Sequence, residues 1–217
     1  MKKEIKICLP VYKIVYSLVF VFILSIIRGI ENVFEIGGAL QAPVAILTVI
    51  FCADTYLTEA QNKRAGVFGL YSLKRRTICV YRRLAIQMIY LIIISIIGYG
   101  LFYWQRPVVL YGDTSSNAFW MFMTAIWGTV LFWGVFSMTV CNLFKNVWMG
   151  IGSAFLIWMG LFSKGGDDFF GKWNLFSYLF REVEVPNNWS WMCGTMVTLA
   201  LAVILIILVP FILKKRG

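Results

Sequence analysis

The sequence predicts an all-α, polytopic membrane protein, a single transmembrane domain that covers residues 1–217 and contains six transmembrane helices. Hydrophobic residues make up 60% of the chain and charged residues only 14%, whereas soluble domains hold about 45–50% apolar and about 25% charged residues. Six separate segments approach the roughly 20 apolar residues that cross about 30 Å of hydrocarbon. The basic residues fall mainly in alternate connections between these segments, which is the distribution expected of cytoplasmic loops.

The six apolar segments are distributed along the whole chain. They span about 14–30, 38–57, 85–104, 117–141, 146–162 and 189–213. The first is the weakest because Arg28 interrupts it, although an arginine near a helix end can extend its guanidinium to the lipid headgroups. Trp104 and Trp189 lie near expected helix ends, where aromatic side chains are favoured at the membrane interface.

The charge distribution predicts a multi-pass protein of the cell membrane with both its N-terminus and its C-terminus in the cytoplasm. With the N-terminus inside, 15 of the 20 Lys and Arg residues fall on the cytoplasmic side. An even number of helices agrees with this orientation. The net charge of +10 would suggest nucleic acid as a partner of a soluble chain, but among these membrane segments it reflects topology, and we expect no nucleic-acid partner.

Two connections outside the apolar segments are apolar enough to meet the membrane surface. Residues 1–13 mix Lys with Ile5, Ile7 and Leu9 and break at Pro10, which predicts either a short amphipathic helix on the inner leaflet or a frayed basic tail. The outer loop 163–188 is rich in Gly and aromatic residues. Its part 173–180 is too short to span the bilayer, but apolar enough to enter the outer interface as a re-entrant or surface helix.

The connection between the second and third helices, 58–84, carries seven basic residues and one acidic residue. Val67, Leu70 and Tyr71 follow the i, i+3, i+4 spacing of one helix face, and basic residues flank them. This pattern favours a short amphipathic element that docks onto a partner at the cytoplasmic side. The alternative is a solvated basic loop that only fixes the topology.

The residue inventory indicates that the chain is not an enzyme and has no catalytic, cofactor or metal site of its own. It contains no histidine, and its five cysteines are isolated, without a C-x-x-C pair, so neither a nucleophile with a histidine base nor a Cys/His zinc site is expected. Gly166–Lys172 matches the letters G-x-x-x-x-G-K, but Trp173 follows where a phosphate loop needs Ser or Thr.

A few polar or helix-bending residues lie in or beside the apolar segments. Gln41 and Pro43 in the second helix are candidates for a substrate path, with a tolerated proline as the alternative. Glu31, Glu35 and Asp54 lie near helix ends, where ordinary interfacial solvation is favoured over a buried functional charge.

This layout resembles the membrane subunit of type 2 ABC exporters, the permease class of bacterial drug, antibiotic-peptide and polysaccharide exporters. The resemblance lies in the basic N-terminal interfacial segment, the cytoplasmic coupling helix between helices two and three, and the re-entrant outer segment before helix six. In the coupling segment, the family's Glu, basic residue and Gly correspond to Glu59, Arg64 and Gly66. The chain departs from the family at Val67, where Thr is common, and at Leu73, where Pro is common.

The resemblance implies that separate ATP-binding cassette ATPase subunits bind the 59–76 element, and that ATP and magnesium bind in those partners rather than in this chain. The residues implied in ATPase coupling are Glu59, Arg64, Gly66, Val67, Phe68, Leu70, Tyr71, Arg75 and Arg76. A second membrane subunit, identical or related, would complete the translocation path. The apolar, aromatic helices suit a hydrophobic or amphipathic peptide, drug or lipid-like molecule as the exported substrate.

Three other functions remain open on the sequence. The chain resembles in helix number the substrate-binding membrane subunit of a vitamin importer, but such a subunit needs a polar ligand pocket. An intramembrane enzyme is disfavoured because the sequence has no histidine and no mid-membrane pair of acids. A regulatory or scaffold membrane protein without transport activity is the third alternative.

Overall fold

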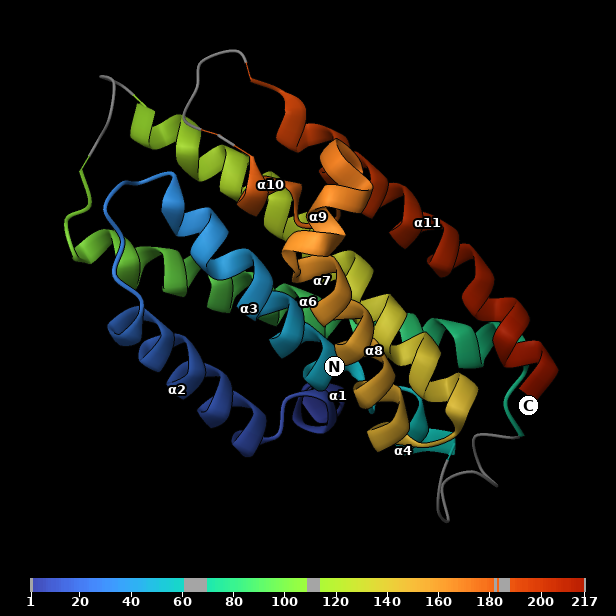
Figure 1. Cartoon of the computed structure of the whole chain (residues 1–217). Helices are drawn as coiled ribbons and strands as arrows, with labels where there is room; N and C mark the ends of the chain where they lie inside the picture. The colour runs from blue at the N-terminus through green and yellow to red at the C-terminus, as the bar shows by residue number, and fades with distance from the viewer. Residues whose placement is uncertain (1, 61–69, 109–113, 182, 184–187, 217) are drawn as a thin grey trace.

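The computed structural model describes residues 2–60, 70–108, 114–181, 183 and 188–216. These residues form helices and no strand, with one isolated bridge between Asn32 and Val108. The elements are α1 (Lys2–Cys8), α2 (Val11–Ile27), α3 (Glu35–Cys52), α4 (Leu57–Ala60), α6 (Leu73–Trp104), α7 (Thr114–Phe144), α8 (Val147–Phe162), α9 (Lys164–Phe170), η1 (Gly171–Trp173), α10 (Ser177–Phe180) and α11 (Ser190–Arg216) (Figure 1).

The all-helical, membrane-compatible class predicted from the sequence is confirmed, whereas the count of six spanning helices is not. Within the described residues, α3, α6, α7 and α11 are long and apolar enough to cross a membrane, and α8 with the bent α9–η1 segment makes a fifth candidate. The apolar helix α2 has 17 residues, which gives it a length of about 26 Å against about 30 Å of hydrocarbon.

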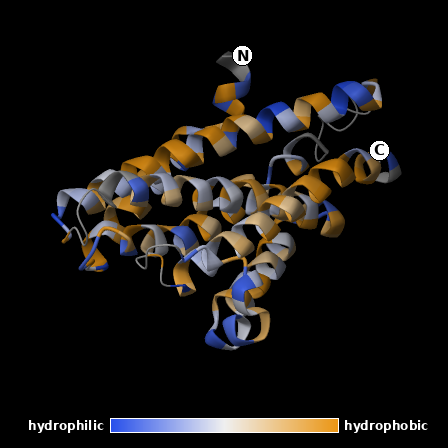
Figure 2. Ribbon diagram, turned by 90° about the horizontal axis from the view of Figure 1, so that it is seen from above, coloured by the Kyte–Doolittle hydropathy of each residue, from blue (hydrophilic) through white to orange (hydrophobic). Residues whose placement is uncertain are grey.

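The helix α3 lies at the centre of the bundle. It packs against α7, α6, α8 and α10, and most of its residues are buried. The largest fully buried side chains around it are aromatic: Trp133, Phe51, Phe102, Phe122 and Phe176. Exposed apolar side chains cover α2, α6, α8 and α11 instead. Figure 2 shows that hydrophobic residues predominate along the helix that ends at the C-terminus, and exposed apolar side chains of this kind are suited to lipid contact.

Both chain termini lie toward the same end of the bundle (Figure 1). We call this the termini end; α4, the first turns of α6 and the last turns of α11 lie at the lower right of the view, and α1 lies toward them near its lower middle. The α2–α3 connection, the last turn of α6 and the first turn of α11 lie at the opposite end. This arrangement agrees with an even number of passes through the bundle.

Of the two alternatives for the N-terminal segment, the structure has the helix, because Lys2–Cys8 forms α1. Pro10 then takes an extended conformation (φ −65°, ψ 152°) as the N-cap residue directly before α2, where its missing N–H leaves no helical hydrogen bond unmade. An ion pair of 2.8 Å between Glu4 and Arg82 joins α1 to α6. Ile5, Lys6 and Ile7 are exposed while Cys8 is buried, so α1 exposes apolar side chains beside a basic one.

The 58–84 connection is shorter than predicted, because α6 begins at Leu73 rather than at residue 85. The apolar run that predicted the third membrane segment starts only after Arg82 and Arg83, which is why its start was placed at residue 85. The helix itself continues through them, because Lys and Arg are good helix formers and no Gly or Pro interrupts residues 73–84. In the same way α11 extends through its basic end to Arg216.

The predicted outer loop 163–188 folds back into the bundle. α9 bends by 72° from α8, and the Ser163 hydroxyl accepts a hydrogen bond from the Gly166 amide at 3.0 Å. The chain then enters the core, where Phe176 and Ser177 have no exposed surface. Gly194 of α11 permits this approach, since a Cβ there would lie 1.9 Å from the Asn174 carbonyl oxygen.

Candidate functional site

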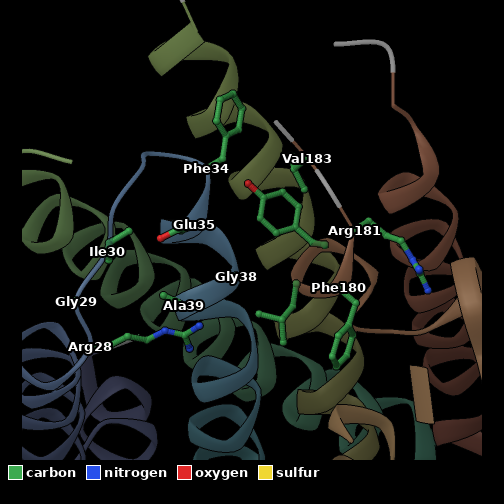
Figure 3. A pocket seen from close by; sticks show the side chains of 12 residues that line it. Arg28, Gly29, Ile30, Phe34, Glu35, Gly38, Ala39, Phe180, Arg181 and Val183 are labelled. Carbon is green, nitrogen blue, oxygen red and sulfur yellow. The ribbon is translucent and has the colours of Figure 1, made fainter. Parts of the chain in front are cut away.

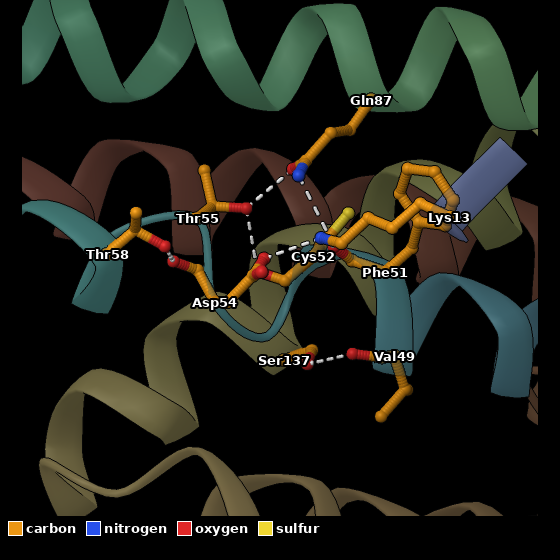
Figure 4. A network of polar contacts seen from close by, with 9 residues as sticks. All are labelled: Lys13, Val49, Phe51, Cys52, Asp54, Thr55, Thr58, Gln87 and Ser137. Carbon is orange, nitrogen blue, oxygen red and sulfur yellow. Dashed lines mark hydrogen bonds and ion pairs between the residues drawn. The ribbon is translucent and has the colours of Figure 1, made fainter. Parts of the chain in front are cut away.

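The first candidate site is a set of polar groups at the C-terminal end of α3, which we call the α3-exit cluster. It consists of the side chains of Lys13, Asp54, Thr55 and Gln87 and the backbone carbonyl of Phe51 (Figure 4). The last carbonyls of any helix lack intrahelical donors. Here Lys13 of α2 supplies one, because its Nζ donates to the Phe51 carbonyl at 2.8 Å. The same Nζ lies 2.7 Å from the Asp54 carboxylate and 4.9 Å from the centroid of the Phe51 ring.

The third helix of the cluster is α6, which contributes Gln87. Its Nε2 donates to the Phe51 carbonyl at 3.3 Å. The Thr55 hydroxyl lies 2.5 Å from Gln87 Oε1 and 2.8 Å from the Cys52 carbonyl, so its single proton serves one of these acceptors at a time. The cluster therefore connects α2, the end of α3 and α6 through buried hydrogen bonds.

Burial differs across the Lys13–Asp54 ion pair. Only 5% of the Lys13 side chain is exposed, against 36% of the Asp54 side chain. The ammonium is thus removed from water and depends on its two oxygen partners, whereas Asp54 keeps part of its hydration. The sequence left the role of Asp54 open, and the structure shows an ion pair with a lysine 41 residues away.

The segment that follows the cluster leads directly into the predicted coupling element. Tyr56 and Leu57 are buried, and the Thr58 hydroxyl donates to the Asp54 carbonyl at 2.7 Å. Glu59 lies in α4, but its side chain is outside the described part of the structure. Of the predicted coupling residues, Arg64, Gly66, Val67 and Phe68 also lie outside the described residues.

The remaining coupling residues lie at the start of α6 and face outward. Leu70 is 85% exposed and Tyr71 47%, and Arg75 is also exposed. The Arg76 Nε donates to the Tyr71 carbonyl at 2.9 Å, which fixes the turn before the helix. Exposed apolar and basic side chains therefore lie close together in sequence just before and within the first turn of α6, a segment that we call the α6-start surface (Leu70, Tyr71, Lys74, Arg75 and the partly exposed Arg76).

The helix α6 is longer than a membrane crossing requires. Its 32 residues extend about 48 Å at about 1.5 Å per residue. A hydrocarbon core is about 30 Å thick, so the length of α6 exceeds it by about 18 Å. The basic residues of α6 are concentrated in its first turns, at the α6-start surface.

The two residues predicted for a substrate path lie in packed surroundings. Gln41 is 1% exposed, and its Nε2 donates to Thr129 Oγ1 at 3.2 Å and to the Leu175 carbonyl at 3.4 Å. Pro43 lies within α3 and is partly buried. Gln41 thus connects α3 to α7 and to the re-entrant segment inside one chain, and its place on a substrate path stays a prediction.

A cavity of about 530 Å³ is the second candidate site, at the opposite end from the α3-exit cluster (Figure 3). It lies between the α2–α3 connection, the first turns of α3 and α10. The lining includes Arg28, Glu35, Tyr178, Phe180 and Arg181. In Figure 3, Arg28, Glu35 and Ala39 stand on one side of the cavity and Phe180 on the other.

The α2–α3 connection that borders this cavity is held by the acidic residues that the sequence left unassigned. Glu35 Oε1 accepts from Asn32 Nδ2 at 2.9 Å, and Asn32 Oδ1 accepts from the Glu35 amide at 3.1 Å. This reciprocal pair closes the turn immediately before α3, whose N-cap residue Phe34 forms no side-chain cap. Glu31 contributes its backbone, which accepts from the Val108 amide at 2.8 Å.

The described part of the chain also contains cysteines and acidic residues away from these two sites. No group of three or more Cys, Asp or Glu residues is placed there to hold a metal ion. Burial in α1 raises the pKa of the Cys8 thiol to about 11, so this cysteine is a neutral thiol near pH 7. Lys13, Thr55 and Gln87 were missed by the sequence analysis, since a single lysine, threonine or glutamine near a helix end carries no local signal.

No protein-family model, curated protein or solved structure matches this chain.

Proposed function

We propose that this chain is the membrane-spanning permease subunit of an ATP-driven exporter, docked to separate ATP-binding cassette ATPase subunits. The observation that carries the proposal is the α6-start surface. It presents exposed Leu70 and Tyr71 beside exposed basic residues, on a helix long enough to project from the bilayer. Exposed apolar side chains outside the lipid favour a protein partner over a loop that only fixes topology.

The α3-exit cluster supports a mechanical role for the connection that begins after it. Lys13 and Gln87 bind the end of α3 to α2 and α6. A displacement imposed on the 59–76 element by an ATPase would therefore move three helices together rather than only the connection. Coupling of this kind needs a contiguous set of packed groups, and the cluster supplies one within a single chain.

The apolar exterior supports the remaining parts of the proposal. Exposed Ile, Val, Leu and Phe side chains on α2, α6, α8 and α11 would contact lipid and a second membrane subunit, identical or related. A hydrophobic or amphipathic peptide, drug or lipid-like substrate would pass between the two subunits. The protein would lie in the cell membrane with its termini end in the cytoplasm, beside the ATPase and its ATP and magnesium.

The test is co-expression with the ATP-binding cassette subunit encoded beside this chain, followed by purification and a measurement of vanadate-sensitive ATP hydrolysis. We expect a stable complex that the double variant Arg75→Glu/Arg76→Glu loses. Acidic residues are favourable in the first turn of a helix, so α6 should still form, although Arg76→Glu also removes the hydrogen bond to the Tyr71 carbonyl. The matched control is Lys164→Glu/Lys172→Glu in α9 and η1, at the other end of the predicted topology.

The outcome of this test separates the alternatives. Retention of the ATPase by the Arg75/Arg76 variant would show that the α6-start surface is not the docking site. Failure of any ATPase subunit to co-purify with the unmodified chain would reject the permease assignment and favour a scaffold or regulatory membrane protein.

A further inference from the structure

The helix α8 is short for a membrane crossing. It has 16 residues, which gives it a length of about 24 Å against about 30 Å of hydrocarbon, and any tilt shortens this span further. The helix α7 ends at the same turn, which contains Lys145, and its 31 residues extend about 46 Å from there. Accordingly, α9, which follows α8, does not reach the end of the bundle where α7 begins (Figure 1).

Charged residues bound α8 at both of its ends. Lys145 lies in the turn before the helix and is exposed, and Lys164, also exposed, begins α9 shortly after it. Because α9 bends by 72° from α8, its 7 residues add only about 3 Å along the α8 axis. The exposed Asp168 of α9 therefore lies at almost the same depth as Lys164.

The side chains of α9 and η1 are typical of the membrane interface rather than of its hydrocarbon. Phe169 is 82% exposed and Trp173 53%, and the Lys172 ammonium lies 5.5 Å from the centroid of the Trp173 ring. Aromatic rings are enriched at the level of the lipid headgroups. An ion pair of 2.8 Å between Arg181 and Asp167 joins α9 to the residue after α10, which holds this level relative to the bundle.

A second helix on the apolar exterior has nearly the same length. α2 has 17 residues, or about 26 Å, and it exposes Val19, Phe22 and Ile26. The exposed Arg28 follows its last turn. Since α2 packs against α6 whereas α8 packs against α3 and α7, a short apolar length recurs at separate places on the exterior.

A bilayer of ordinary thickness around α8 would bury the charges of α9. With about 30 Å of hydrocarbon, these charges would lie about 6 Å below the headgroups. Lys164 can extend its ammonium toward the headgroups, but the short side chain of Asp168 cannot reach as far. Hydrocarbon strongly disfavours a carboxylate, whereas compression of a bilayer by a few Å has a modest cost. The lipid is therefore expected to adapt to the helix.

We propose that the outer face of α8, with its exposed Leu156, Ile157 and Met159, selects phospholipids whose acyl chains are shorter than those of a typical bilayer. Such lipids match the length between the charged ends of α8 without compression. The helix α11 sets no such limit, because its 27 residues extend about 40 Å. This selection concerns lipid contact alone and is independent of the proposed ATPase docking.

The test is photo-crosslinking of lipids to the full-length chain in liposomes. A benzophenone side chain replaces Leu156, and the liposomes contain equal amounts of dimyristoleoyl, dioleoyl and dierucoyl phosphatidylcholine, which differ in acyl-chain length. Mass spectrometry identifies the lipid in each adduct. We expect the ratio of dimyristoleoyl to dioleoyl adducts to be about threefold higher at position 156 than with the same group in place of the exposed Ile204 of α11.

The double variant Lys164→Leu/Asp168→Leu keeps the net charge and should lose the excess at position 156, because α9 can then enter the hydrocarbon. The matched control is Lys74→Leu, which removes an exposed charge from the first turn of α6, a helix longer than the hydrocarbon; it should keep the excess. Equal ratios at positions 156 and 204 would overturn the proposal. Adducts between two copies of the chain at position 156, without lipid adducts, would also overturn it, since a second copy would then cover α8.

Discussion

Replacement of Lys13 by methionine should destabilise the folded chain by about 2 kcal/mol. Methionine keeps most of the apolar stem of the lysine but removes the ammonium. The Phe51 carbonyl and the Asp54 carboxylate then lose the hydrogen bonds that the Lys13 ammonium donates to them at 2.8 and 2.7 Å. A hydrogen bond to a charged group contributes about 1.5–3 kcal/mol. Asp54 is 36% exposed and regains water, so its share is nearer the 0–1 kcal/mol of surface ion pairs.

Two further contacts adjust this value. Gln87 Nε2 still donates to the Phe51 carbonyl at 3.3 Å, which lowers the cost, while loss of the ammonium over the Phe51 ring adds about 0.5–1 kcal/mol. A change of 2 kcal/mol is about a 30-fold change in the unfolding equilibrium. Titration with SDS in mixed micelles, followed by tryptophan fluorescence, measures it.

Controls make this prediction specific to the cluster. Lys6→Met changes an exposed lysine of α1 and should leave the free energy of unfolding within about 0.5 kcal/mol. Asp54→Asn keeps an oxygen acceptor for Lys13 and should cost about 1 kcal/mol. The double variant Lys13→Met/Asp54→Asn should cost less than the sum of the single changes, because the two residues contact each other. A Lys13→Met chain as stable as the unmodified protein would refute the reasoning.

Three other expectations follow from the packing and the thiol chemistry. Gly194→Ala should destabilise the folded chain by about 1–3 kcal/mol in the same SDS titration, since the added Cβ would lie 1.9 Å from the Asn174 carbonyl oxygen. The control is Gly152→Ala, whose Cβ would meet nothing within 4 Å and which should be neutral or stabilising by up to about 1 kcal/mol. Equal costs for the two variants would show that the close approach at Gly194 does not limit stability. Gln41→Leu should change the free energy of unfolding by less than about 1 kcal/mol. The loss of two long hydrogen bonds is offset by the removal of a buried Oε1 that has no partner among the described residues. A loss above about 3 kcal/mol would show that this amide contributes more to stability than these two bonds. With the other four cysteines replaced by alanine, the maleimide reaction of Cys8 should keep accelerating as the pH rises toward about 11, because only the thiolate reacts; a plateau near pH 9 would contradict its burial.

The local pattern of the sequence predicted the all-helical, membrane-compatible class but not the contacts between the helices. Apolar runs indicate the helices because lipid and core demand the same residues, yet they placed the start of the third helix at residue 85 instead of Leu73. The pairing of Lys13 with Asp54 joins residues 41 apart, and no local periodicity encodes such a contact. Arg28 was read as an interruption of a helix, whereas the fold places it in a cavity with Arg181.

The exposure of the predicted coupling residues could likewise be foreseen only in part. The i, i+3, i+4 spacing indicated an apolar face, and the described members Leu70 and Tyr71 are exposed. For Gln41 the sequence predicted a place on a substrate path, which stays a prediction, and it did not indicate the hydrogen bonds that this amide donates to Thr129 and to the Leu175 carbonyl. A single sequence does not show whether a polar group in a membrane helix faces a substrate or a neighbouring helix.

The docking of an ATPase on the α6-start surface is tested most directly by site-specific photo-crosslinking. A benzophenone side chain in place of Tyr71, which is 47% exposed, should form an adduct with the co-expressed ATP-binding cassette subunit in native membranes. The same group in place of the exposed Trp173 of η1 should form none. The account is contradicted if position 71 gives no ATPase adduct in membranes that contain both proteins, or if position 173 gives an equal one.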